Sequence, residues 1–471
     1  MKHSDQTMQA TGSSGGTSED KDKLLADTIE AEITRKPPSP CSIYRVPVKF
    51  RKKSDKDTYE PRIVSIGPYH HDSEKFKTTE EHKKWYLHDL ISRNTTPNTS
   101  LQDFVKEIRK MESHVRVCYA EPIDLDSDKF VKMMVFDGCF ILELLYKYLE
   151  KRGDHGKHDR DVNLDGADEG EALGTMTTDL NDPILGTTWM IYSVRKDLVL
   201  LENQLPFMVL EKLFDLTKYP TRGSYTLTAL VTSFFNPILP TVRPVETNSS
   251  TKGRHILDLL RNLLLPKQQV MEFGRSPYWE YTQSATDLSE TGVKFKKKVD
   301  TDCLLDITFD ENGVFEIPPF VFGESWTVLL PNLIALEQCR RDYTDQITSY
   351  VILMDSLINN ENDVKILRKK GIIDGLFNED EKVAIDINNL FKGAVVDKYY
   401  YDGLCNRVNA YCKTRWHRWR ATLVRDYFNT PWALISFLAA LVLLLLTTAQ
   451  TVFAILSYSP DKSSGNSTGN P

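Results

Sequence analysis

The chain has 471 residues, of which 27% are charged and 41% are hydrophobic. This composition is that of a folded body and excludes a wholly disordered chain. The formal net charge of −7 argues against nucleic acid as a partner, and we expect none. The N-terminal residues MKHSDQTMQATGSSGGTSED contain no apolar stretch, so we expect no secretory signal peptide.

Residues 1–40 are rich in Gly, Ser and charged residues and end in Lys36-Pro-Pro-Ser-Pro40. Because such a segment cannot bury enough apolar surface to fold, we predict a disordered N-terminal tail. Residues 41–428 are predicted to form a mostly helical globular domain. An alternating run at 42–50 predicts a short strand near its start.

The first helical block follows. A helix is predicted from an N-cap at Thr78 or Thr79, and a second one begins after Ser100. Residues 129–149 are apolar on most sides, which predicts a helix at the centre of the core. The acidic, Gly-rich residues from about 151 to 180 predict an exposed insert before the next block.

The second helical block contains Pro206, which cannot continue a helix because it has no N–H group. Two helices are therefore predicted, joined at Glu202, Asn203 and Gln204. Polar side chains beside a core must be hydrogen-bonded. We expect these three to bond the main-chain groups that the helix break leaves free. The alternative is that they present an acid or an amide to a ligand.

Near residue 300 the pattern changes to alternation between apolar and polar residues. Asn312-Gly313 separates two of the alternating runs, which predicts a hairpin. We therefore expect a small antiparallel β element within the helical domain. The three runs span residues 293–299, 303–309 and 314–322.

Long helices are predicted for the C-terminal part of the body. One covers residues 326–358 and is expected to kink at Pro331, which removes a helical hydrogen bond. A last helix is predicted from about Val395 almost to Asn429. The fold class expected is thus mainly α, with one transmembrane helix added.

The stretch from Trp432 to Tyr458 contains no charged residue. At about 1.5 Å rise per residue, a helix of this length spans roughly 40 Å, which crosses a hydrocarbon core of about 30 Å with some tilt. We predict a transmembrane helix over residues 432–458 and the lipid bilayer as a partner. Leu441 and Leu446 lie within this membrane anchor. Its length favours the thicker plasma membrane.

A basic flank precedes the span and sets its expected orientation. Cytoplasmic flanks carry the excess of Lys and Arg, whereas residues 459–471 form a short polar tail. We expect the globular body in the cytosol and the tail on the far side of the membrane. The flank also suits anionic lipid headgroups, with a merely solvated basic face as the alternative. Its residues are Lys413, Arg415, Arg418, Arg420 and Arg425.

One side of the span carries small and polar residues. Such residues let membrane helices approach closely, and an amide can bond across to a neighbour. This pattern predicts a helix–helix face and a homo-oligomer. The alternative, which we favour, is that the hydroxyls donate to carbonyls of their own helix. The residues are Ser436, Thr447, Gln450 and Thr451.

The seven cysteines include no Cys-X-X-Cys pair, which indicates reduced thiols in the cytosol. Cys139, within an apolar helix, is expected to be buried and inert. Asn94, Asn98, Asn248 and Asn466 fit the acceptor pattern for N-glycosylation. Only Asn466 lies on the predicted far side, so modification of the other three would invert the topology.

The candidate metal site is weak. His70, His71 and His82 lie near Glu80 and Glu81, and these side chains are ligands of zinc and iron. The HExxH spacing is absent, so we expect a polar turn and a helix start without a metal. A membrane-tethered metal-dependent enzyme is the alternative. Motifs for phosphate binding and hydrolysis are also absent, and we expect no cofactor and no catalytic residues.

Several segments together resemble one family. They are IYRVP at 43–47, YEPRIVSIGPYHH at 59–71, EEHK at 80–83, DLVLLENQLPFMVLEKLF at 197–214, TGVKFKKK at 291–298, LLDITF and EIP within 304–318, and PNLIALEQC at 331–339. With the C-terminal span, they are similar to the plant domain-of-unknown-function 247 family over roughly residues 41–460.

The resemblance implies a single-pass membrane protein without a known catalytic site. Some grass members of the family are pollen-side determinants of self-incompatibility, which implies recognition or signalling. The sequence therefore predicts a membrane-anchored, non-enzymatic recognition or signalling protein of plants, with a protein partner that it does not name.

Overall fold

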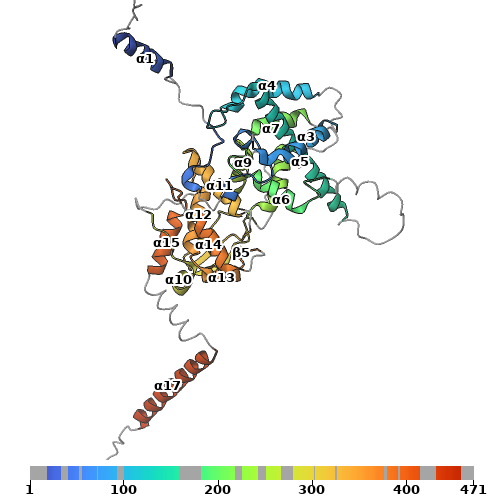
Figure 1. Cartoon of the computed structure of the whole chain (residues 1–471). Helices are drawn as coiled ribbons and strands as arrows, with labels where there is room; N and C mark the ends of the chain where they lie inside the picture. Colours follow the sequence, from blue (N-terminus) through green and yellow to red (C-terminus); the bar gives the residue numbers. More distant parts are fainter. Residues whose placement is uncertain are drawn as a thin grey trace, which may run out of the picture. The chain divides into compact units, whose positions relative to one another are not determined.

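A computed structural model gives the fold (Figure 1). The chain divides into two compact units, Met1–Cys41 and Ser42–Pro471. The structure describes residues 18–32, 41–51, 56–71, 73–92, 100–158, 182–217, 225–241, 251–266, 279–301, 303–323, 326–375, 379–390, 393–413 and 431–457.

The first unit contains a helix where the sequence predicts disorder. Helix α1 covers Ser18–Glu32, and its described side chains are all exposed. The segment is rich in Glu, Lys, Leu and Ala and lacks Gly and Pro, so its intrinsic helix propensity is high. The prediction of a wholly disordered tail over residues 1–40 is therefore wrong for α1.

Helix α5 (Ser127–His158) is the centre of the first helical block. It is contacted by α3 (Lys77–Ser92), α4 (Leu101–Arg116), α7 (Phe207–Leu216) and α8 (Leu227–Phe235). Figure 1 shows α3, α4 and α7 near α5. The predicted core helix is confirmed. It is longer than predicted, because it continues into the start of the predicted acidic insert. The rest of that insert lies outside the described residues.

The start of α4 follows its predicted cap. The Asp103 carboxylate accepts the Ser100 main-chain N–H at 2.8 Å, which completes a capping box. Phe104, Ile108 and Val115 are buried on one face of the helix. The apolar spacing read from the sequence thus becomes the face that packs against α5 and α7.

The second half of the body is also mainly helical. Helix α11 (Trp326–Cys339) contacts α9 (Ile256–Leu264), α12 (Gln346–Leu357) and α14 (Asp380–Leu390). The remaining described helices of the body are α2 (Lys56–Tyr59), α6 (Thr188–Asp197), α10 (Ala285–Glu290), α13 (Glu361–Lys369), α15 (Asp402–Lys413) and the 3₁₀ turns η1 (Val48–Phe50), η2 (Pro68–His70), η3 (Glu74–Phe76) and η4 (Asn236–Ile238).

The single helix predicted over residues 326–358 is wrong, because the chain breaks between α11 and α12. Glu337, buried near the end of α11, explains the break. Its carboxylate accepts hydrogen bonds from the N–H groups of Ile347 and Thr348 at 3.2 and 2.9 Å, and from the Thr348 hydroxyl at 2.6 Å. The free N–H groups at the start of α12 are thus satisfied from the preceding helix.

The last predicted helix begins later than expected, at Asp402 instead of about Val395. The Val395 N–H and carbonyl are both bonded to the side chain of Gln338, at 2.8 and 2.7 Å. The Asp397 N–H donates to Asp345 at 2.9 Å. These main-chain groups are therefore engaged by α11 and its following loop and cannot form helical bonds.

Short strands complete the body. Strands β2 (Thr308–Phe309) and β3 (Val314–Ile317) pair antiparallel across the Asn-Gly turn, as predicted. The other pairings are parallel: β1 (Lys294–Lys297) with β3, and β4 (Phe320–Val321) with β5 (Ile373–Asp374). The strand predicted at 42–50 is reduced to one bridge between Ile43 and Tyr119, followed by η1.

His255 gives the fold a pH dependence. It is buried, with Nε2 3.0 Å from the Ser42 carbonyl oxygen, and its Nδ1 accepts the Asp258 N–H at 3.3 Å. Burial lowers the pKa of His255 to about 4. Because the unfolded chain holds this proton more tightly, with a pKa of about 6.5, stability is complete above that pH and falls as the pH decreases toward 4.

We expect His255 to cost roughly 2 kcal/mol of unfolding free energy when the pH drops from 7.5 to 5. Urea unfolding of the full chain in detergent measures this difference. His255→Gln should remove it, whereas His88→Gln, at an exposed position, should not. An equal pH effect in the wild type and His255→Gln would contradict the assignment.

Candidate functional site

The predicted helix break before Pro206 is a buried polar joint. Helix α6 ends before it, and α7 begins directly after Pro206. Glu202, Asn203 and Gln204 are all buried between the two helices. Since buried polar groups need partners, their contacts show what the triplet does.

Glu202 is surrounded by basic side chains. Its Oε1 accepts the main-chain N–H of Val46 at 2.6 Å and a hydrogen bond from the Arg51 guanidinium. Its Oε2 lies 3.4 Å from His70 Nε2 and 3.6 Å from Arg45 Nη1. Burial alone raises a carboxyl pKa, but the nearby His70 and the hydrogen bond from Arg51 hold the pKa of Glu202 below its usual value. Glu202 therefore stays ionised at neutral pH.

Asn203 and Gln204 bond main-chain groups, as expected from the sequence. Asn203 accepts the Ile66 N–H at 2.7 Å and donates to the Val64 carbonyl at 3.0 Å. The Gln204 amide nitrogen donates to two carbonyls just after α6, both at 2.8 Å, and its oxygen accepts the Leu257 N–H at 3.1 Å. The triplet thus ties the break to two distant segments.

Asp197, at the end of α6, completes the joint. Its carboxylate accepts the three consecutive N–H groups of residues 62–64 at 2.6 to 2.9 Å. Gly67 then approaches so closely that an added Cβ would lie 2.7 Å from the Gln204 carbonyl oxygen. Gly67 also has φ +73°, which a side chain would disfavour. Segments distant in sequence are therefore held together by hydrogen bonds between side chains and main-chain groups.

A buried ion pair lies beside this joint. Lys83 is fully buried and donates to the Ser65 carbonyl at 2.5 Å and to Glu80 and Asp137, both at 2.6 Å. The second oxygen of Asp137 accepts the Gly67 N–H at 2.8 Å. Burial alone lowers a lysine pKa, but the charges of Asp137 and Glu80 raise the pKa of Lys83 above its usual value. Burial acts on the partner as well and raises the pKa of Asp137 above its usual value, against the charge of Lys83. The pair joins α3 to α5 through this hydrogen-bonded contact.

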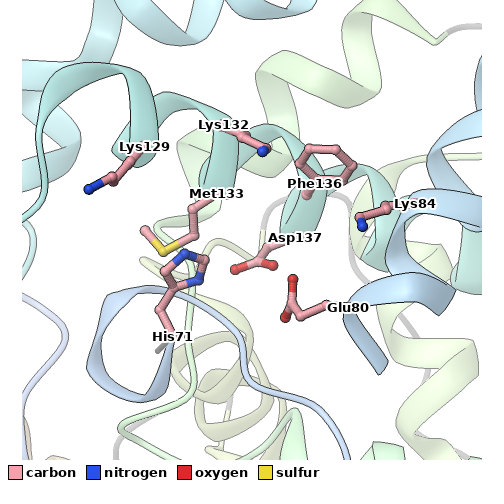
Figure 2. Close-up of a pocket in the computed structure, with 8 residues that line it drawn as sticks. All are labelled: His71, Glu80, Lys84, Lys129, Lys132, Met133, Phe136 and Asp137. Carbon is pink, nitrogen blue, oxygen red and sulfur yellow. The ribbon is translucent and has the colours of Figure 1, made fainter. Parts of the chain in front are cut away.

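A pocket of about 280 Å³ lies next to the ion pair (Figure 2). Helix α3 contributes Glu80 and Lys84, and His71 follows η2. In Figure 2 the carboxylates of Glu80 and Asp137 lie near the His71 imidazole. Helix α5 supplies the remaining wall, with Lys129, Lys132, Met133, Phe136 and Asp137.

The histidines of the alternative metal site have separate environments. His70 contacts Glu202, His71 lines the pocket, and His82 lies on α3. Among the residues that the structure describes, no three His, Cys, Asp or Glu side chains are grouped so that they could hold a metal ion. The described geometry thus gives the metal-dependent alternative no support.

The seven cysteines all fall within the described ranges, and each is a free thiol. Cys139 is buried in α5, and burial raises its pKa, so the thiolate is disfavoured. Cys118 donates to the His114 carbonyl one helical turn earlier at 3.3 Å. The expected burial of Cys139 is confirmed.

Helix α17 covers Pro431–Ser457. Within the described parts of the chain, it is the one helix long and apolar enough to cross a membrane, over Ile435–Ile455. Trp432 is 77% exposed, and Leu441 and Leu446 are also exposed. An apolar surface of this extent is not stable in water, which is compatible with the predicted anchor. Tyr458 lies outside the described residues.

The hydroxyls of α17 bond within their own helix. Thr447 donates to the Leu443 carbonyl at 2.9 Å, and Thr451 to the Thr447 carbonyl at 2.8 Å. This is the alternative that the sequence favoured for these residues. The helix–helix face with Ser436 and Gln450 remains a prediction.

Of the basic flank, Lys413 alone lies within the described residues. Lys413 ends α15 and lies 3.4 Å from Glu280. The other flank residues and the four glycosylation acceptors lie outside the described residues. They are Arg415, Arg418, Arg420, Arg425, Asn94, Asn98, Asn248 and Asn466.

Sequence reasoning missed the Lys83–Asp137 pair. A signal was present, because Asp137 lies among apolar residues of a long helix, and a buried charge requires a partner. The partner is 54 positions earlier in the chain. The sequence does not show which cation would reach it.

Comparisons with known proteins agree with the resemblance seen in the sequence. A profile of DUF247, described as "Plant protein of unknown function", matches residues 43–446. UPF0481 protein At3g47200 of Arabidopsis thaliana is 30% identical, with 92% of this chain and 89% of the relative covered. Putative UPF0481 protein At3g02645 of the same plant is 22% identical, with 88% and 90% covered. No solved structure matches.

Proposed function

Because this chain belongs to the plant protein family DUF247, whose function is unknown, we propose a function from its own residues. The protein is a membrane-anchored, non-enzymatic recognition or signalling protein. Helix α17 holds it in the bilayer, and the helical body recruits a protein partner or transmits a signal in the cytosol. The plasma membrane is the proposed location, and recognition between cells, as in pollen self-incompatibility, is the proposed kind of process.

The observation that carries this proposal is the exposed apolar surface of α17. Its described side chains are exposed along the whole helix, in contrast to the less apolar α11, where residues from Trp326 to Glu337 are buried except Thr327. A helix that is apolar all round and not covered by protein is suited to lipid. This contrast supports anchoring instead of a core role for α17.

The use of the motif residues supports a non-enzymatic role. Glu202, Asn203, Gln204 and Asp197 spend their polar atoms on main-chain groups and on neighbouring cations. Catalytic groups are usually placed in a cleft with reactive atoms directed at the substrate. Here the same groups hold distant segments of the chain together, so their role is to stabilise the fold of the body.

Protease protection on sealed plant microsomes tests the proposal. We expect a tag at the N-terminus to be digested and a tag at the C-terminus to be protected, because the basic flank keeps the body on the cytosolic face. Deletion of residues 431–471 should move the protein into the soluble fraction. Crosslinking in the same membranes should return a specific protein partner.

Three outcomes would contradict parts of this proposal. Full-length protein in the soluble fraction would remove the anchor. Protection of the N-terminal tag would invert the topology. Crosslinking that returns no partner, from membranes in which a known membrane complex crosslinks as a positive control, would count against recognition.

A further inference from the structure

The pocket beside Lys83 has a cationic rim. Lys84, Lys129 and Lys132 are exposed residues of α3 and α5 that line it. Lys84 is paired with Glu81 at 2.5 Å, and Lys129 lies 3.4 Å from Asp126. In the described residues, Lys132 has one recorded interaction, with the Phe136 ring at 5.8 Å. Lys132 is thus the rim cation best placed to receive an anionic group.

The wall below the rim is apolar. Met133 is buried, and Phe136 is half-buried, one turn apart on α5. In Figure 2 the Met133 thioether lies near the His71 imidazole, and the Phe136 ring lies beside Lys132. A thioether and an aromatic ring in the same wall favour contact with a flat apolar group. The volume of about 280 Å³ is at the small end for ligand pockets and suits a molecule with one ring.

The inner end of the pocket accepts hydrogen bonds. Lys83 donates its three ammonium protons to Ser65, Glu80 and Asp137, so it has no further proton to donate to a ligand. The carboxylate oxygens of Glu80 and Asp137 can each accept a further hydrogen bond. His71 Nδ1 is buried and has no hydrogen-bond partner within the described structure. A ligand group at this end should therefore be a donor.

We propose that this pocket binds a small amphipathic acid. The anionic group of the ligand lies at Lys132, its ring packs against Met133 and Phe136, and a hydroxyl group donates to the inner carboxylates. The proposal concerns a ligand of the body and does not depend on the membrane topology proposed above.

Three one-ring probes with different end groups separate the contributions of the anionic group and of the hydrogen-bond donor to the affinity. 4-Hydroxyphenylacetate has the anion and the donor, tyramine replaces the anion with a cation, and 4-methylphenylacetate lacks the donor. Titration calorimetry on the full chain in detergent micelles measures each affinity. We expect 4-hydroxyphenylacetate to bind at least about tenfold more tightly than either of the others, since a hydrogen bond to a charged group is worth a factor of this size.

Two lysine variants locate the binding. Lys132→Met should weaken the binding of 4-hydroxyphenylacetate about tenfold and should not weaken that of tyramine, whose ammonium group Lys132 repels. Lys110→Met, at an exposed position of α4 that does not line the pocket, should change neither affinity. Both positions are exposed, and a thermal melt checks that each variant is folded. The proposal would be overturned if none of the three probes bound, or if the wild type bound tyramine more tightly than 4-hydroxyphenylacetate. An unaltered affinity of Lys132→Met for 4-hydroxyphenylacetate would also overturn it.

Discussion

Lys83→Met is expected to destabilise the body by about 3 to 5 kcal/mol, enough to leave much of the protein unfolded in cells. The physical reason is that Asp137 would keep its buried carboxylate and lose the cation 2.6 Å away. The Ser65 carbonyl and Glu80 would lose a donor at the same time. Urea unfolding of the full chain in detergent measures the change.

The neighbouring lysine is the matched control. Lys84 is exposed and pairs with exposed Glu81, so Lys84→Met should cost less than about 0.5 kcal/mol. The double variant Lys83→Met with Asp137→Leu should recover part of the loss, because no charge is then buried without a partner. A Lys83→Met protein as stable as Lys84→Met would show that the pair is not buried as described.

Glu202→Gln is expected to cost about 2 to 3 kcal/mol, since it removes the charge from hydrogen bonds that involve cations. The amide oxygen can still accept the Val46 N–H, but the ionic contacts with Arg51 and Arg45 are lost. Those two guanidinium groups are partly exposed and can be hydrated, which keeps the loss below that of Lys83→Met. Unfolding in urea at pH 7 measures the difference.

The pH profile identifies the cause. The pKa of Glu202 is lowered by folding, so its contribution is present above the ordinary pKa of a glutamate and is lost as the pH falls below it. The wild type and Glu202→Gln should therefore converge in acid. Glu121→Gln, which removes the exposed partner of the same Arg45, should have little effect at any pH. A constant difference between wild type and Glu202→Gln would point to packing instead of charge.

Local patterns predicted the elements whose partners are close in sequence. The cap at Ser100, the turn at Asn312-Gly313 and the break before Pro206 all depend on residues a few positions apart. Each of these features was found where the sequence placed it. The apolar helix α5 was also recognised, because its composition alone requires burial.

Features that depend on distant partners were missed. Nothing near Val395 shows that its main-chain groups are bonded to Gln338, so a helix was predicted there. The same holds for Glu337, which ends one helix and starts the next. The pocket needs α3 and α5 side by side, and no periodicity specifies which faces of two helices meet. Such contacts follow from the tertiary fold.

The bond between Val46 and Glu202 sets an order of events during synthesis. The two residues are 156 positions apart. At a ribosomal rate of about 5 to 20 residues per second, the segment that holds Ile43 and Val46 waits roughly 8 to 30 s for its partner to be made. Ile43 and Val46 are buried in the folded body, so both remain exposed until Glu202 has been synthesised. A chaperone that shields nascent chains would therefore protect this stretch first.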